Sequence, residues 1–462
     1  MIQNFDCQKI LKTALKNGGD FAEIYAEESE PTQIISEDKK IEKIVQGVDR
    51  GVGIRVIHNH QTAYGYTNEI SEKALLALAG KISEAVQAKT FGRPIKLKST
   101  SSGLSLPVEI PPWKTELEKK VGFVTEAARI GWEAGGPVKQ VKVVYGDNRK
   151  NLWIANSLGA LTEEERSYTL FFVHITAATN GLIQTGYYPV GGYLGLELLE
   201  KETPEKVARE AVRQAFLALK AKQSPAGRMP VVLSSEAGGT MVHEAIGHGL
   251  EADLASEKLS VYHGKKGQKI ATPQITIWDD ATLPTRRGSF LFDDEGTPSE
   301  KTVLVDKGIL KNYMYDHLMG MKDGVPSTGN GRRESYRFKP ICRMTNTIIA
   351  PGTDDPASIL RSTPKGLFVK KMGGGQVNTV NGDFVFEVNE GYLIENGRIG
   401  EPVRGAMLTG NGPEVLRTID RVGSDLGFGI GTCGKDGQGV PVGDAQPTLR
   451  IPELTVGGCQ EK

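Results

Sequence analysis

The sequence predicts an α+β fold, with an N-terminal antiparallel sheet flanked by helices and a β-rich C-terminal domain. Helical and strand patterns alternate in the first half, whereas the second half is mostly strand-like. At 462 residues the chain exceeds one compact core, so we expect two domains. The turn-rich segment Pro225-Ala-Gly-Arg-Met-Pro230 predicts the boundary, which places the domains at 1–225 and 226–462.

The first half carries helical segments between groups of short strands. Apolar side chains recur at helical spacing in four segments, 5–17, 71–88, 115–135 and 204–222. Strand patterns occupy 21–28, 32–47 with a break, 51–58, 61–67, 139–147, 151–157, 165–178 and 181–190. Residues 89–112 are rich in serine, lysine and proline, which predicts a linker or an exposed loop.

Turn signals organise the second half. Asn381-Gly382 and Asn396-Gly397 are typical of two-residue hairpin turns. Between them Phe384, Phe386 and Val388 alternate with more polar neighbours, so we expect a strand with one face in the core. A helical pattern returns briefly at 413–422.

Composition excludes several classes of function. The chain has 56 Lys plus Arg and 56 Asp plus Glu, which leaves no electrostatic basis for binding nucleic acid or an anionic membrane. No stretch approaches a membrane span, and no apolar run of signal-peptide length follows Met1. Four scattered cysteines are too few for a disulfide framework. We therefore expect a cytoplasmic protein with reduced thiols.

The segment Ser235–Asp253 contains the motif HExxxH, formed by His243, Glu244 and His248. Imidazoles are preferred zinc ligands, and a carboxylate beside one of them can handle the proton of a metal-bound water. The chain has only seven histidines, so we expect a chance match in roughly one such chain in a hundred. The motif predicts metal-assisted hydrolysis.

The spacing of the two motif histidines conflicts with a regular α-helix. Positions i and i+5 lie roughly 140° apart around a helix, so the two side chains would diverge. A π-bulge, or a helix that ends between them, would bring them together. Gly247 and Gly249 make either distortion easy, and Gly238 and Gly239 further weaken the helix. The segment is suited to close packing around a site.

A third ligand must come from elsewhere in the chain. Glu251 and Asp253 follow the motif so closely that they are better placed to orient an imidazole. Cys433 lies among glycines that leave its sulfur accessible, and a thiolate is an excellent zinc ligand. Lone cysteines are more often buried small hydrophobic residues, and we expect this role for Cys7, Cys342 and Cys459.

Acidic residues and other motifs leave further alternatives open. Later acidic residues, which we expect in solvated loops, could also bind metal: Glu257, Asp279, Asp280, Asp293, Asp294 and Glu295. His58 and His60 are typical of surface histidines on a hairpin. In the loop Gly329–Arg337, Arg332 or Arg333 could bind a substrate carboxylate or an oxyanion, or Glu334 could simply pair an arginine.

Taken together, these motifs resemble the TldD/PmbA family of metallopeptidases, in the TldD branch that retains the metal motif. The likeness covers nearly the whole chain after about residue 150, with a weaker but colinear N-terminal part. It runs through Asn156–Gly159, Gly238–Asp253, Asp293–Pro298, Thr328–Ser335, Arg343–Thr347, Gly373–Gln376, Cys433–Gln438, Pro441–Gly443, Gln446–Leu449 and Leu454–Gly458.

The resemblance implies a zinc metalloprotease in which His243, His248 and Cys433 bind the metal and Glu244 is the catalytic acid/base. It implies unfolded or extended peptides as substrates, taken in by β-strand addition. It also implies a homodimer, or a heterodimer with a PmbA/TldE-like subunit that lacks the metal motif. Two alternatives remain open: a zinc-stabilised peptide-binding or scaffold subunit without catalysis, and another zinc amide hydrolase.

Overall fold

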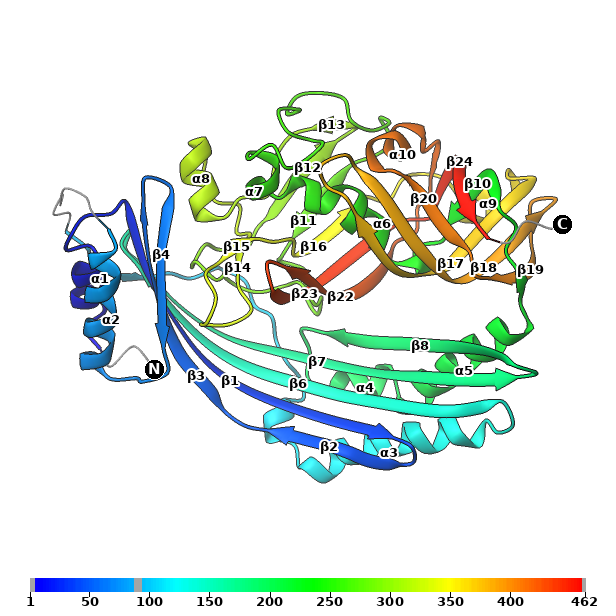
Figure 1. The fold of residues 1–462 in the computed structure, drawn as a ribbon, viewed down its shortest axis with the longest axis horizontal. Coiled ribbons are helices and arrows are strands. Elements are labelled where there is room, and N and C mark those ends of the chain that lie inside the picture. Colours follow the sequence, from blue (N-terminus) through cyan, green and yellow to red (C-terminus); the bar gives the residue numbers. More distant parts are fainter. Residues whose placement is uncertain (1–4, 87–93, 459–462) are drawn as a thin grey trace.

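The computed structural model describes residues 5–86 and 94–458, and its fold is α+β, as predicted. Figure 1 shows a long curved sheet with a β-rich body above its concave side. Cys459 lies outside the described residues. Among the described helices, none has the length and apolar character needed to span a lipid bilayer.

The first sheet has eight strands and is antiparallel except where β5 joins β7. Its order is β4-β3-β1-β6-β7-β5, with β2 also paired to β1 and β8 paired to β7. The strands are β1 (Phe21–Glu37), β2 (Lys40–Gln46), β3 (Asp49–His58), β4 (Gln61–Thr67), β5 (Lys98–Ser99), β6 (Val138–Asn156), β7 (Ala160–Thr179) and β8 (Leu182–Gly192).

Two strands of this sheet are longer than predicted. β1 continues through 29–31 and β6 through 148–150, where the sequence predicts breaks. Residues 29–31 of β1 pair with residues 148–150 of β6, so each polar stretch holds the other in the ladder. Pairing across the sheet overrides the weak strand propensity of these residues.

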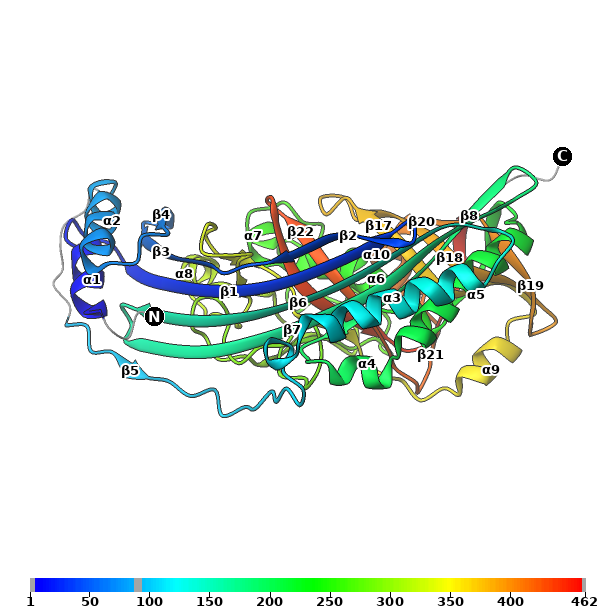
Figure 2. The ribbon, with the colours of Figure 1, turned by 90° about the horizontal axis from the view of Figure 1, so that it is seen from below.

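Helices cover one face and one end of the first sheet. Figure 2 shows α3, α4 and α5 lying across the long strands, and α1 and α2 pack together at the end near β3 and β4. Except for the short α4, these helices lie within the predicted ranges. Their bounds are α1 (Cys7–Ala14), α2 (Glu72–Glu84), α3 (Leu117–Glu133), α4 (Glu197–Lys201) and α5 (Pro204–Lys220).

The second half contains another eight-stranded sheet, which closes on itself because β17 pairs with β18 as well as with β10. Its strands are β9 (Lys222–Gln223), β10 (Gly227–Leu233), β17 (Lys365–Val377), β18 (Asp383–Glu395), β19 (Arg398–Arg404), β20 (Met407–Asn411), β21 (Arg421–Val422) and β24 (Leu449–Gly457). The predicted alternation in β18 is confirmed, since Phe384, Phe386 and Val388 are buried. Asn396 and Gly397 form the predicted turn, with φ of 52° and 72°.

A third sheet of six strands, in the order β13-β12-β11-β16-β23-β22, lies beside this sheet. Its strands are β11 (Ile277–Asp280), β12 (Lys301–Asp306), β13 (Ile309–Leu310), β16 (Asn346–Ile349), β22 (Gly427–Lys435) and β23 (Gln438–Gln446). A small ladder joins β14 (Gly331–Arg332) to β15 (Ile341–Cys342). β22 is an edge strand of the third sheet, because among the described strands it pairs only with β23.

Short helices connect the strands of the second half. They are α6 (Thr240–Val242), α7 (Ala252–Ala255), α8 (His317–Asp323), α9 (Pro356–Arg361) and α10 (Gly412–Thr418). The helix predicted at 413–422 is therefore too long, because Arg421 and Val422 pair with β24 instead. The first sheet ends at Gly192 and the next begins at Lys222, and the domain boundary near residue 225 stays a prediction.

Candidate metal centre

The HExxxH motif forms a π-helical turn at His243–Gly247, between α6 and a 3-10 turn at His248–Leu250. The backbone N–H of His248 donates to the carbonyl of His243, five residues back. This wider turn absorbs the extra residue of the motif and places the two imidazole centroids 5.0 Å apart. The predicted helix distortion is confirmed.

The glycines of the motif segment allow close packing against the third sheet. A Cβ added at Gly239 would lie 2.4 Å from the backbone nitrogen of Ala445, and one at Gly247 would lie 2.2 Å from the Met344 sulfur. Neither position has room for a side chain. The glycines that weaken the helix are therefore the residues that allow it to pack closely against its neighbours.

Cys433 lies on β22 and reaches both motif histidines. Its Sγ is 3.3 Å from Nε2 of His243 and 3.3 Å from Nε2 of His248. All three ligand atoms lie within 4.8 Å of one another. Zinc bonds of the usual lengths at tetrahedral angles would separate such atoms by roughly 3.3–3.6 Å. Both sulfur–nitrogen distances are 3.3 Å, so the donor set suits one zinc ion.

The hairpin of β22 and β23 carries this cysteine, and the sequence contains a signal for this hairpin. Asp436 and Gly437 form its turn, with φ of 51° and 72°, and Lys435 pairs with Gln438 on either side. Asp-Gly between strand-like segments is a strong signal for such a turn. It predicts a hairpin immediately after Cys433.

The electrostatic surroundings favour a thiolate at Cys433. Burial raises the pKa of the thiol, but the hydrogen bonds to the two motif imidazoles and the charges of these imidazoles together lower the pKa to about 5. Burial lowers the pKa of His248, whereas Glu251 and Cys433 together raise it well above its usual value. The site therefore favours negative charge on sulfur, which is the form that binds metals.

The two acidic residues after the motif have different roles. Glu251 is buried and its Oε2 lies 2.9 Å from Nδ1 of His248, as predicted for a residue that orients the ring. Lys435 donates to Glu251 at 3.0 Å and to Asp253 at 2.7 Å. Asp253 thus contacts the lysine and neither imidazole. The Nδ1 atom of His243 has no hydrogen-bond partner among the described residues.

Glu244 lines a cavity of about 710 Å³ together with the three candidate ligands. Burial raises the pKa of its carboxyl group, and the two motif histidines partly offset this increase. The other walls come from β22, from β23 and from residues 373–377 of β17. A carboxylate that can accept a proton therefore faces the same space as the candidate metal ligands.

The other acidic candidates do not join this site. The expectation that they lie in solvated loops is wrong for five of them, because Asp279, Asp280, Asp293, Asp294 and Glu295 are buried. Backbone N–H groups, hydroxyls and arginines satisfy their oxygens, as Asp279 shows with Thr345, Thr347 and Asn330. Glu257 pairs with Lys322 at the surface. Within residues 5–86 and 94–458, only the His-His-Cys cluster has the geometry of a metal site.

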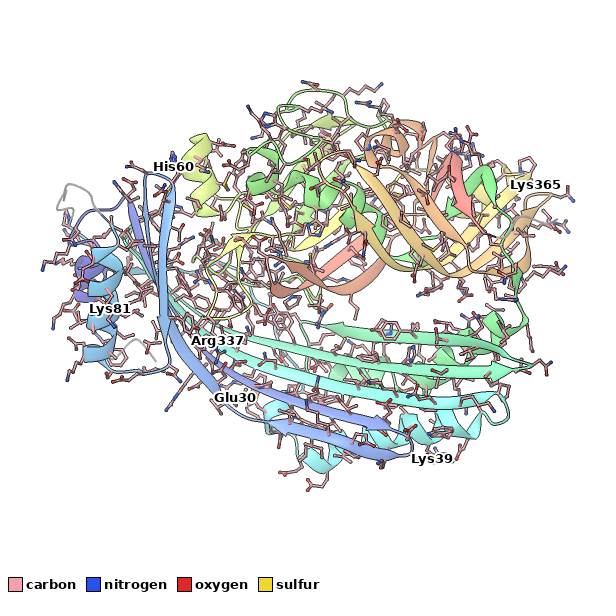
Figure 3. All side chains as sticks on the ribbon, viewed as in Figure 1. Glu30, Lys39, His60, Lys81, Arg337 and Lys365 are labelled. Carbon is pink, nitrogen blue, oxygen red and sulfur yellow. The ribbon has the colours of Figure 1, made fainter. Side chains whose placement is uncertain are left out.

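The arginine loop does not reach the cavity. Arg333 binds Glu23 of β1 and the carbonyl of Asp294, and Arg332 binds the carbonyls of Met344 and Pro441. Glu334 accepts from the backbone N–H of Gly439, and no arginine within residues 5–86 and 94–458 pairs with it. Figure 3 shows Arg337 of this loop beside the first sheet, where it pairs with Asp49. The loop joins the two halves of the molecule.

The remaining histidine and cysteine candidates lie apart from the site. Figure 3 shows His60 at the tip of the β3–β4 hairpin, and it is exposed there. His58 is half-buried and lies 3.6 Å from Asp20. Cys7 and Cys342 are buried, as predicted.

Sequence comparison assigns the whole chain to one family. Models of the PmbA/TldA metallopeptidase domains match residues 22–88 (domain 1), 110–219 (central domain) and 226–458 (C-terminal domain). The chain is 37% identical over 449 residues to a Haemophilus influenzae protein named metalloprotease TldD homolog, covering 95% of this chain and 93% of the relative. A Methanothermobacter thermautotrophicus metalloprotease is 35% identical, covering 95% and 96%.

Solved structures share the fold. A protein from Thermotoga maritima superposes with a TM-score of 0.80 at 21% identity, covering 97% of this chain and 98% of that one. TldE from Thermococcus kodakarensis superposes with a TM-score of 0.78 at 18% identity, covering 97% and 99%. Fold and sequence together define a metal-dependent peptidase. The chain belongs to the PmbA/TldD family of metallopeptidases.

Proposed function

We propose that this chain hydrolyses peptide bonds of unfolded or extended peptides, with zinc bound by His243, His248 and Cys433 and with Glu244 as catalytic acid/base. The observation that carries the proposal is the cluster itself: three ligand atoms of suitable spacing share one cavity with a carboxylate. Bound zinc would supply a Lewis acid that polarises the scissile carbonyl and acidifies a water molecule.

The protein's own groups handle the protons and the geometry. Glu244 accepts the proton of the attacking water and passes it to the leaving amine. Burial raises the pKa of Glu244, which brings the carboxyl group closer to the range useful for this transfer. Glu251 holds the His248 ring in place. A thiolate donates more charge to the metal than an imidazole, so we expect slow turnover.

The edge of β17 supports an extended substrate. Beyond Val369, the only pairing of β17 among the described strands is with β18. Residues 373–377 of this segment line the cavity, and a Cβ at Gly374 would meet nothing within 4 Å. A peptide strand could therefore hydrogen-bond to this edge beside the metal ligands, a mode of binding that selects extended chains.

A partner subunit and the cellular location belong to the proposal as well. We propose a homodimer, or a heterodimer with a PmbA/TldE-like subunit, and the fold shared with TldE supports a related partner. The cytoplasmic location and the absence of nucleic-acid and membrane partners stay predictions from composition.

The test compares wild-type protein with Glu244→Gln on an unstructured peptide, with and without a PmbA-like partner. We expect cleavage to fall by about 10²–10⁴-fold while metal content is unchanged, because the substitution removes the proton acceptor but no ligand. Unchanged cleavage would contradict the assigned role. Bound metal without any cleavage in the wild type would favour the scaffold alternative, and cleavage of small amides alone would favour another hydrolase.

A further inference from the structure

Arg343 is fully buried and binds the backbone of the hairpin that carries Cys433. Its guanidinium donates to the carbonyl oxygen of Cys433 on β22 and, at 3.2 Å, to that of Gln438 on β23. The backbone of Arg343 is anchored in turn, because its N–H donates to the carbonyl of Asn330 at 2.9 Å. One side chain thus ties both strands of the hairpin to the protein body.

Among the described strands, no other backbone ladder holds the tip of this hairpin. β16 pairs with β23 only at Gly443, Asp444 and Ala445, whereas Cys433 lies opposite Val440. An isolated two-stranded hairpin is only marginally stable in water. Figure 1 shows the β22–β23 hairpin lying beside β14 and β15. Arg332 is the last residue of β14, and Arg343 directly follows β15. The position of the sulfur therefore depends on side chains that bind the tip.

Arg343 is costly to bury. Among the described residues no carboxylate forms an ion pair with it, and its Nε has no hydrogen-bond partner. Arg333, which is also buried, instead pairs with Glu23. From beyond ion-pair distance the positive charge of Arg343 helps to lower the pKa of the Glu251 carboxyl group, and a buried charge without a direct ion pair lowers stability. Such a group is poorly explained as a core-filling residue, and its bonds lead directly to the backbone of a candidate metal ligand.

We propose that Arg343 is a positioning residue that holds the Cys433 thiolate at the distance the two histidines require. The inference rests on the proposed function, specifically on Cys433 as a ligand. Lysine cannot reproduce the forked geometry by which a guanidinium binds two carbonyls at once. Partners that orient metal ligands typically change metal affinity by 10–100-fold when they are mutated.

The experiment titrates metal-free protein with Co²⁺ and follows both the dissociation constant and the thiolate-to-cobalt charge-transfer absorption. Arg343→Lys and Arg343→Gln should raise the dissociation constant by about 10–100-fold and weaken the charge-transfer band. Arg333→Lys is the matched control, because Arg333 is equally buried but binds Glu23 of the first sheet. It should bind Co²⁺ as the wild type does.

Each outcome separates this inference from the proposed function. A wild-type protein that binds Co²⁺ without a thiolate signal would remove Cys433 from the ligand set and overturn both. If the wild type shows the thiolate signal, two results would overturn only the role of Arg343. One is Co²⁺ binding by the Arg343 variants that equals that of the wild type. The other is an equal loss of Co²⁺ affinity in Arg333→Lys. Thermal unfolding checks the fold: if both Arg343 variants fail to fold, Arg343 is a core residue and the proposal is wrong.

Discussion

Cys433→Ala is the substitution that most directly tests the metal site. It removes one of the three candidate ligands and leaves both histidines and Glu251 in place. Complete four-ligand zinc sites bind with apparent free energies of about 10–16 kcal/mol, so one ligand contributes roughly 3–4 kcal/mol. We therefore expect metal affinity to fall by about 10²–10³-fold.

The assay combines a competition titration against a chelator with thermal unfolding. A metal that binds only the folded state raises the unfolding temperature, so chelation should lower this temperature for wild type by more than for Cys433→Ala. Cys342→Ala is the control, since Cys342 is also buried but its sulfur accepts only from the backbone of Asp316. Wild-type affinity in Cys433→Ala, or an equal loss in Cys342→Ala, would refute the assignment.

Two further predictions concern stability. Burial, and then the charge of Glu295, raise the pKa of Asp316 to about 7, so between pH 4 and 7 the folded state keeps a proton that the unfolded chain has lost. Asp316→Asn should be the more stable protein above pH 7, by at most about 4 kcal/mol, and denaturant unfolding at pH 4 should show no such difference. Gly239→Ala should lower the unfolding free energy by about 1–3 kcal/mol, because its Cβ would lie 2.4 Å from the Ala445 nitrogen. Gly80 lies in helix α2, and a Cβ added there would meet nothing within 4 Å. Gly80→Ala should therefore raise the unfolding free energy by about 0.5–1 kcal/mol. Equal effects of the two substitutions would contradict the packing argument.

Local sequence patterns predicted the helices well, because a helix forms its hydrogen bonds within one segment. The helices at Leu117–Glu133 and Pro204–Lys220 follow from apolar spacing within a single segment. The breaks predicted near residues 30 and 149 are wrong because these polar residues are held by pairing with each other across the sheet. Local sequence carries no information about which strand lies alongside.

The acidic residues show a similar limit. Asp293, Asp294 and Glu295 have the composition of a solvated turn, yet they lie between the two halves of the molecule and are buried there. Arg55 and Arg166 of the first sheet pair with Glu295 and Asp294. Asp293 instead accepts hydrogen bonds from backbone N–H groups. These arginines are distant in sequence, so only the packing of the first sheet against the second half reveals the pairs.

By itself, the sequence predicted the residue types of the candidate metal site and one element of its geometry. Two histidines five positions apart require a distorted helix if they are to bind one ion, and the neighbouring glycines predict where it bends. The resemblance already named Cys433, but only the tertiary structure shows that its sulfur reaches both histidines, because Cys433 lies on a hairpin 190 residues beyond His243. Two long-range contacts hold that hairpin. Arg343 donates to the carbonyl of Cys433, and Lys435 of the hairpin donates to Glu251. Sequence spacing specifies direction within one element, whereas the meeting of separate elements depends on how the whole chain packs.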